Sequence, residues 1–433
     1  MLLMQALGND NWISSIIWLI LFFVMVFLYP RLMIYQQVTK LEKDIADLEK
    51  MSNSSINKIV KRMSKKAQKD LKKKIFSFLE FFVAEPVSID PYGIVDKIHE
   101  VVKLSENREI EFVEKLSPNM NIHEKRSISA AISATSGLHQ IIKIMRYYLE
   151  LIKKYKILQL ALILQMEMPL IKRLARSYVK ATDAFVDDAP IGDGIGPLVV
   201  ASMIPENAKV KHMKDEEFSY AKTKINGKTV ILAKATGPGA TIGYPGKFVE
   251  KLLKKEKIDR IITVDAAGAM YGEKNGVIME GVGVGNRGGG LTVYHGFIIE
   301  EIATKKKIPI DSIGIKEVGE TAIYPMKEEI LKSLPRVKEK LMEFIKKGDK
   351  NEKILVIGFG NTSGIGNSKK GLEKTFETIK KKIREMKKEE EAKKKKKSSF
   401  FGISNFLGYF LLPQSPDFRL YEAISNYRYK FSY

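Results

Sequence analysis

The apolar run from Trp12 to Tyr29 constrains this chain most strongly, because it is long enough to cross a lipid bilayer. It contains no charged residue. As a helix it would extend roughly 27 Å, close to the ~30 Å thickness of the hydrocarbon core. A cleaved signal peptide is the alternative, but no basic residue precedes Trp12 and no small-x-small site follows the run. We therefore expect an N-terminal segment, residues 1–30, with a retained transmembrane helix over residues 12–29.

The charges beside this run predict its orientation. Asp10 precedes it, whereas Arg31, Lys40 and Lys43 follow it. Basic residues next to a span remain on the cytoplasmic side. The sequence thus predicts a single-pass protein of the cell membrane whose large C-terminal part is cytoplasmic.

The net charge predicts an anionic partner. The 433 residues include 73 Lys and Arg against 51 Asp and Glu, a formal charge of +22. Beside a membrane such an excess favours anionic lipids. Nucleic acid would also fit the charge, but the sequence contains no clear nucleic-acid-binding module. The absence of Cys excludes disulfides, thiolate metal sites and a cysteine nucleophile. We expect no cofactor.

Helical patterns occupy the first half of the chain after the span. Residues 31–75 read as a basic juxtamembrane helix, and residues 76–184 as a helical region. Lys58 to Lys74 holds nine basic residues, a candidate contact for anionic headgroups. Ile157 to Ile171 is apolar, but Gln, Glu and Pro interrupt it, so we predict a core helix and not a second span.

A short apolar seam lies within the juxtamembrane helix. Val38, Leu41, Ile45 and Leu48 keep a 3-4-3 spacing, which is typical of a coiled coil. Either a second copy covers this seam, giving a homo-oligomer, or the chain's own helices do.

From residue 185 to 380 the pattern changes to alternating strands and helices. Most of the 31 Gly lie here. Asn226-Gly227 between two β-rich runs predicts a hairpin. Strand–glycine loop–helix alternation predicts an α/β fold with a largely parallel sheet. The expected buried-type strands are 259–264, 277–282 and 353–358, and the expected helices are 248–257, 298–305 and 326–347.

The end of the chain divides into two segments of unusual composition. Residues 381–399 are dominated by Lys and predict a linker. Residues 400–433 begin with an apolar, aromatic stretch that is too short to span a bilayer. It either anchors at the membrane interface or docks on the protein itself.

Two glycine-rich loops are candidate substrate- or anion-binding elements. In the first, the backbone N–H groups near the start of a helix could bind an anion, although a tight structural turn explains it equally well. The second contains a GxGxxG spacing, which is a weak dinucleotide signal because it comes late in the domain. The residues concerned are Gly237, Gly239 and Gly243 in the first loop, and Gly283, Gly285, Asn286 and Arg287 in the second.

Asp193 and Asp265 form the candidate catalytic pair. Asp265 directly follows the apolar strand IITV, so it should lie at the carboxyl edge of the sheet. Burial and a neighbouring carboxylate raise the pKa of a carboxyl group, and two such groups can act as acid and base. Asp193 lies in a glycine-flanked loop before PLVV and is the natural partner. The alternative is that Asp193 caps a helix and Asp265 stabilises a turn.

Four motifs in order carry a resemblance to the spore germination protease family, over about residues 187–322. They are GDGIGPLVV (192–200), GPGATIG (237–243), IITVDAAGA (261–269) and GVGVGNRGGGL (281–291). The first and third also resemble hydrogenase-maturation endopeptidases. The segment upstream of the first aspartate and the insertion 220–235 depart from the germination protease pattern. With its anchor, the whole chain resembles an archaeal membrane-anchored family of unknown function.

The germination protease resemblance implies a three-layer α/β/α domain of the phosphorylase/hydrolase type. It assigns Asp193 and Asp265 as the pair of an atypical aspartic endopeptidase acting on a peptide substrate. The maturation endopeptidases imply an alternative, a divalent transition metal held by Asp193, Asp265 and His295. A third class is non-catalytic, a membrane-tethered ligand-binding or scaffold protein.

Overall fold

The computed structural model describes residues 11–64, 68–83, 93–270, 272–285 and 294–404. The chain divides into two compact units, each of which is described by itself. The first comprises residues 1–53 and 138–175, and the second comprises residues 54–137 and 176–433. Of the predicted aromatic tail, residues 400–433, the first five end the last helix of the chain, and residues 405–433 lie outside the described residues.

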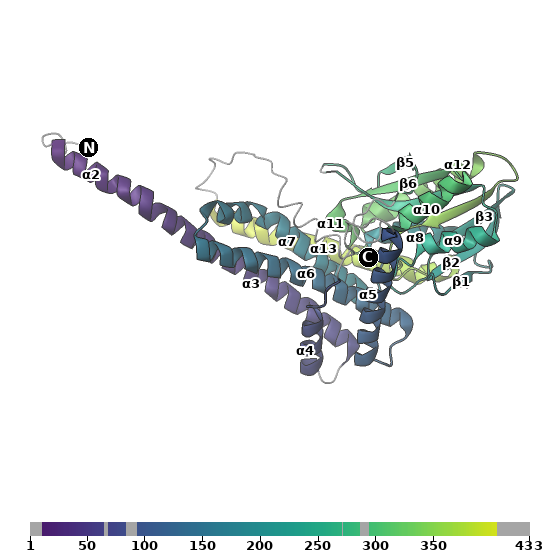
Figure 1. Ribbon diagram of the computed structural model, residues 1–433, viewed down its shortest axis with the longest axis horizontal. Coiled ribbons are helices and arrows are strands. Elements are labelled where there is room, and N and C mark those ends of the chain that lie inside the picture. The colour runs from purple at the N-terminus through teal and green to yellow at the C-terminus, as the bar shows by residue number, and fades with distance from the viewer. Residues whose placement is uncertain (1–10, 65–67, 84–92, 271, 286–293, 405–433) are drawn as a thin grey trace. The chain divides into compact units, whose positions relative to one another are not determined.

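A continuous helix contains the predicted transmembrane run. It consists of α2 (Asn11–Phe23), a π-helical turn η1 (Val24–Leu28) and α3 (Tyr29–Met63) (Figure 1). Pro30 does not break this helix. A proline in a helix removes one hydrogen bond and displaces the carbonyl of the preceding turn. The π turn before Pro30 accommodates this change, because the Tyr29 N–H bonds to the carbonyl of Val24, five residues back.

From Ser15 to Tyr29 the side chains of this run are exposed among the described residues. Trp18, Phe22 and Met25 are exposed. Within the described residues, one helix, Ser15–Met63, is long and apolar enough to cross a membrane. The prediction of a helix that could span a membrane at this place is therefore supported.

The first unit packs three helical segments around one apolar seam. The seam residues Leu41, Ile45 and Leu48 of α3 are buried. They share this unit with parts of α6 (Ile122–Tyr155) and α7 (Leu158–Val186). Ion pairs link the same segments at their surfaces, among them Lys172–Asp44 at 2.5 Å and Lys153–Glu42 at 2.9 Å. Of the two ways in which the seam could be covered, the structure shows coverage by the chain's own helices. The run 157–171 forms a helix with one buried face, as predicted.

The second unit contains a seven-stranded mixed sheet in the order β1-β2-β3-β7-β4-β6-β5. The strands are β1 (Lys211–Met213), β2 (Phe218–Ile225), β3 (Lys228–Ala235), β4 (Arg260–Gly268), β5 (Ile278–Val282), β6 (Ile310–Glu317) and β7 (Lys353–Gly358). The central strands β3, β7, β4 and β6 are parallel. The β2–β3 hairpin is confirmed, with its turn at Asn226 and Gly227. Both residues have the positive φ that this turn requires.

Helices accompany the sheet within the same unit (Figure 1). They are α8 (Ile195–Met203), α9 (Pro245–Lys255), α10 (Tyr294–Lys306), α11 (Gly319–Ala322), α12 (Glu328–Lys346) and the long α13 (Leu372–Ser404). Before them in the sequence come α4 (Gln68–Phe78) and α5 (Ile94–Leu116). The predicted order, a helical region followed by an α/β domain, is confirmed.

Two apolar clusters use alternate residues of the same strands. Ile262 and Val264 of β4 belong to a cluster with α8 and α12. Ile261 belongs to a second cluster with Phe248 and Ile299, from α9 and α10. Because successive strand residues point to opposite faces, the two clusters lie on opposite faces of the sheet.

Two sequence predictions need correction. Strand β5 was expected to be of the buried type, but it is an antiparallel edge strand with mostly exposed residues. A short apolar run does not distinguish these cases, because edge strands also contain Val and Ile. The Lys-rich segment 381–399, predicted as a linker, is helical and continues α13. Lys, Glu and Ala are strong helix formers, and pairs such as Lys382–Glu385 support the helix surface.

Candidate functional site

The parallel strands end together at one edge of the sheet, where the polar side chains of interest gather. Asp265 lies near the end of β4, opposite Gly314 of β6. Its side chain is buried, with 6% exposure. The register places it on the face of Ile261 and Thr263. Burial raises the pKa of Asp265 well above its ordinary value, and the charge of Asp193 raises it further.

Asp193 lies in a single 3-10 turn, η2 (Gly192–Gly194), which leads directly into α8. Its Oδ2 accepts a hydrogen bond of 2.8 Å from the backbone N–H of Asn361, in the loop after β7. Burial raises the pKa of Asp193 to about 6, while the Asn361 N–H opposes part of this rise. The loop approaches closely, since a Cβ on Gly360 would lie 1.9 Å from the Asp193 carbonyl oxygen. Glycine at 360, with its φ of 121°, permits that approach.

The structure therefore brings the two predicted aspartates into one electrostatic environment. Asp265 and Asp193 come from elements that are remote in sequence, yet one carboxylate perturbs the other. The backbone N–H of Asn361 stabilises the ionised form of Asp193. Their catalytic role remains a prediction.

Three further polar side chains at this edge were missed by sequence reasoning. Glu317, Asn361 and Ser363 are 2%, 1% and 0% exposed. Neither carboxyl oxygen of Glu317, nor Asn361 Nδ2, nor Ser363 Oγ has a hydrogen-bond partner among the described residues. Buried polar atoms are normally paired, so such orphans indicate a place for a ligand or water. The available signal was the position of these residues near strand ends: Glu317 is the last residue of β6, and Asn361 lies in the loop after β7.

The loop with Gly237, Gly239 and Gly243 is held by internal hydrogen bonds. The Gly237 N–H donates to Asn367 Oδ1 at 2.8 Å, and the Gly243 N–H donates to Thr241 Oγ1 at 3.0 Å. A Cβ on Gly239 would lie 3.0 Å from the Cα of His123, so the helical region packs tightly against this loop. These contacts favour the structural turn over an anion site.

Carboxylates surround the same loop and add to this argument. The Tyr244 hydroxyl donates to Glu106 Oε2 at 2.5 Å, and Thr241 donates to Glu217 Oε2 at 2.8 Å. Arg126 of α6 pairs with Glu217. A small cavity of about 40 Å³ lies between α5, α6 and the loop.

The second glycine loop also contacts a carboxylate. The Val284 N–H donates to Glu300 Oε1 at 3.1 Å, so the site that an anion would occupy already holds a negative side chain. Gly283 has φ +85° and accepts a bond from Ser312 Oγ. A Cβ on Gly285 would lie 3.2 Å from that Oγ. Asn286 and Arg287 lie outside the described residues.

The metal alternative finds no support in the described part of the chain. No group of three or more His, Asp or Glu side chains there could hold a metal ion. His295 is buried against Tyr294, with ring centroids 3.9 Å apart. Burial lowers the pKa of His295 well below its ordinary value, and His99 and Lys247 lower it further. His295 thus belongs to an aromatic cluster of α5, α9 and α10. It was predicted as a metal ligand only from its order in the sequence after Asp193 and Asp265.

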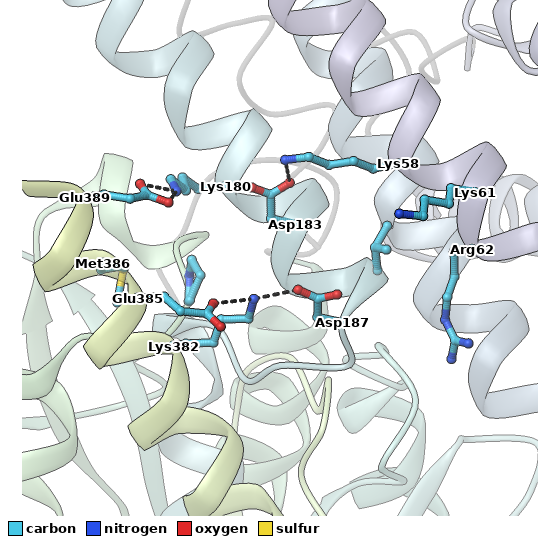
Figure 2. A pocket seen from close by; sticks show the side chains of 12 residues that line it. Lys58, Lys61, Arg62, Lys180, Asp183, Asp187, Lys382, Glu385, Met386 and Glu389 are labelled. Atoms are coloured by element: carbon cyan, nitrogen blue, oxygen red, sulfur yellow. Dashed lines mark hydrogen bonds and ion pairs between the residues drawn. The ribbon is translucent and has the colours of Figure 1, made fainter. Parts of the chain in front are cut away.

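A larger groove of about 450 Å³ lies elsewhere in the second unit, between α3, α7 and α13 (Figure 2). Its basic and acidic side chains largely neutralise each other. Lys58 pairs with Asp183, and Lys180 bonds to both carboxyl oxygens of Glu389, at 2.9 and 2.7 Å. This mixed charge makes the groove a weak candidate for an anionic ligand.

Comparison with known families assigns both halves of the chain. Residues 15–188 match the model described as protein of unknown function (DUF1512), N-terminal domain. Residues 191–366 match the model described as domain of unknown function (DUF1512), C-terminal. No curated protein matches the chain. The chain therefore belongs to this family of unknown function, and the family boundary falls just before the Asp193 turn.

Proposed function

We propose that this protein is a membrane-anchored hydrolase that cleaves peptide bonds with the carboxyl pair Asp193 and Asp265. The observation that carries the proposal is that the charge of Asp193 acts on the buried carboxyl of Asp265, which comes from a remote part of the sequence. Perturbed carboxyl pairs at the carboxyl edge of a parallel sheet are where acid–base chemistry is usually found.

The different surroundings of the two carboxyls assign their roles. Asp193, ionised above about pH 6, would accept a proton from a water molecule as that water attacks the amide carbonyl. Asp265, whose pKa burial raises well above its ordinary value, would hold a proton and donate it to the leaving amine. A base poised near the working pH and an acid that holds its proton are what general acid–base catalysis needs.

The fold and the membrane complete the proposal. The opposite apolar clusters of β4 support a three-layer α/β/α domain of the hydrolase type. The positive-inside rule supports a cytoplasmic location for this domain. Lys61 and Lys73 are exposed and are the better candidates for anionic lipids, since Lys58 and Arg62 form internal ion pairs.

The test uses the full-length chain in detergent micelles with fluorescently labelled casein as the probe. Asp193→Asn and Asp265→Asn should each abolish hydrolysis, and the double variant should be no worse than either single variant, because the pair acts as a unit. Asp215→Asn, at an exposed aspartate, is the matched control and should retain full activity. Hydrolysis that survives either Asn substitution at the pair would refute the proposal.

The alternative is a non-catalytic, membrane-tethered ligand-binding or scaffold protein. The tight packing of the helical region on the loop at Gly239 favours it, because this contact leaves only a small cavity. A wild-type chain that cleaves no probe would favour this alternative.

A further inference from the structure

Glu317 lies at the end of β6, outside the predicted aspartate pair. It is fully enclosed by protein, and both of its carboxyl oxygens lack a hydrogen-bond partner among the described residues. An ionised carboxylate in such a place would pay a large desolvation cost with no compensating bond. The group is therefore held as a neutral acid.

The backbone just before Asp193 packs directly on this acid. A Cβ added to Gly192 would lie 1.9 Å from Glu317 Oε1, a distance that no side chain permits. The Gly192 N–H donates to the Tyr324 carbonyl at 2.9 Å, which holds the turn in place. Glycine at 192 thus lets the Asp193 turn and the Glu317 carboxyl occupy adjacent positions.

The charges that act on Glu317 come from two elements. Burial raises the pKa of Glu317 well above its ordinary value, the charge of Asp193 raises it further, and Lys327, before α12, lowers it. Asn361, whose backbone N–H bonds to Asp193 Oδ2, also has a buried and unpartnered Nδ2. The turn is therefore flanked by an orphan acid and an orphan amide donor, which points to a polar ligand at this place.

We propose that Glu317 is a third member of this carboxyl site, a positioning residue whose neutral form keeps Asp193 as the single ionised carboxylate. Loss of the Glu317 proton at alkaline pH would place a second negative charge beside Asp193 and stop the reaction. This inference rests on the proposed hydrolase activity, so its test has one arm that needs no substrate.

The first arm measures stability in the full-length chain in detergent micelles. Pulse proteolysis monitors urea unfolding at pH values between about 5.5 and 8.5. The proteins compared are the wild type, Glu317→Gln and a control, Glu206→Gln, at an exposed glutamate. A buried neutral acid makes the unfolding constant rise up to about tenfold per pH unit between its unfolded and folded pKa values. The wild type and Glu206→Gln should show this extra slope, and Glu317→Gln should lack it.

Parallel pH dependence in the wild type and Glu317→Gln would overturn the inference. If the Gln variant is not recovered, Glu317→Met, which is apolar and of similar length, should show the same loss of slope.

The second arm measures the pH profile of casein hydrolysis. Glu317→Gln should retain activity and move the alkaline limb upward by at least about one pH unit, with KM unchanged. A merely structural role would leave that limb in place. If Asp193→Asn is inactive while the Glu317→Gln profile overlays the wild type, the role of Glu317 is refuted and the hydrolase stands. If the wild type cleaves nothing, the hydrolase is refuted and the stability arm alone decides the protonation of Glu317.

Discussion

Replacing Asp193 by Asn should stabilise the protein at neutral and alkaline pH. Asn keeps a side-chain oxygen that can accept the Asn361 N–H, so the bond at Asp193 Oδ2 is preserved. What the substitution removes is the cost of holding a charge in a largely buried place. The structural alternative, an aspartate that caps or stabilises a turn, predicts a loss of stability.

The magnitude follows from the shift in pKa. The pKa of Asp193 rises from 3.8 to about 6 on folding. One pKa unit corresponds to about 1.4 kcal/mol, which gives an upper limit of roughly 3 kcal/mol. The side chain retains partial exposure, so solvent screening reduces the expected gain to about 2 kcal/mol.

The stability difference between Asp193→Asn and the wild type depends on pH. The folded pKa of Asp193 lies above the unfolded value, so its stabilising effect is complete below pH 3.8 and is lost as pH rises toward about 6. The variant and the wild type should therefore converge at pH 4 and differ most above pH 6. Removal of the Asp193 charge also relieves Asp265, which adds to the difference.

Thermal unfolding of the full-length chain, read by brief proteolysis, measures this effect. Tryptophan fluorescence would not report on it, because both Trp residues lie in α2. A gain of about 2 kcal/mol should raise the Tm of a domain of this size by roughly 4–8 °C at pH 8. Asp215→Asn, at an exposed position, should change the Tm by no more than a degree or so. A lower Tm for Asp193→Asn at pH 8 would refute the reasoning and support a structural aspartate.

Three other predictions follow from the contacts described. Gly192→Ala should destabilise the fold by about 1–3 kcal/mol through overlap with Glu317. A second substitution in the same chain, Glu317→Ala, should remove most of that cost. If the shifts in urea midpoint of the two single variants add up in the double variant, the contact is contradicted. Burial raises the pKa of Glu106 to about 8, so the wild type should lose stability as pH rises from about 4.5 to 8. Glu106→Gln, which keeps an acceptor for Tyr244, should not show this loss. Hydrogen exchange of α5 against pH measures it, and equal exchange in the two proteins would contradict it. Protease added outside right-side-out vesicles should spare the domain after α3, whereas its digestion would reverse the proposed orientation.

Local patterns in the sequence predicted much of the fold. The apolar run before Tyr29 and the Asn226-Gly227 hairpin depend on neighbouring residues alone, and both are present. The edge position of β5 depends on which strand pairs with which, so the short run 277–282 could not reveal it. The segment 381–399 was interpreted as a linker because of its Lys-rich composition, whereas the propensity of Lys, Glu and Ala favours the helix that the structure shows.

The site was predictable only where one side chain follows an apolar strand. Asp265 follows the apolar run IITV within β4 and was identified in this way. Its catalytic pairing with Asp193 stays a prediction, although the charge of Asp193 acts on Asp265. His295 came from order along the chain, which does not report distance, and it packs on Tyr294 instead. The glycine loops were ambiguous in sequence because tight packing and ligand binding both require glycine.

The arrangement of glycines explains why the carboxyl site is concentrated at one edge of the sheet. The α8 turn and the ends of two strands approach so closely that a Cβ on Gly196 would lie 2.4 Å from the Val264 carbonyl oxygen, and one on Gly358 2.4 Å from the Gly196 carbonyl oxygen. Backbone contacts of this kind bring Asp193 over the strand that carries Asp265, and Gly192 does the same beside Glu317. Each close approach excludes water and so raises the pKa of the carboxyls it brings together. The glycines and the raised pKa values of the carboxyls at the site are therefore physically linked, and substitutions at these glycines should alter the pH dependence of stability as well as its magnitude.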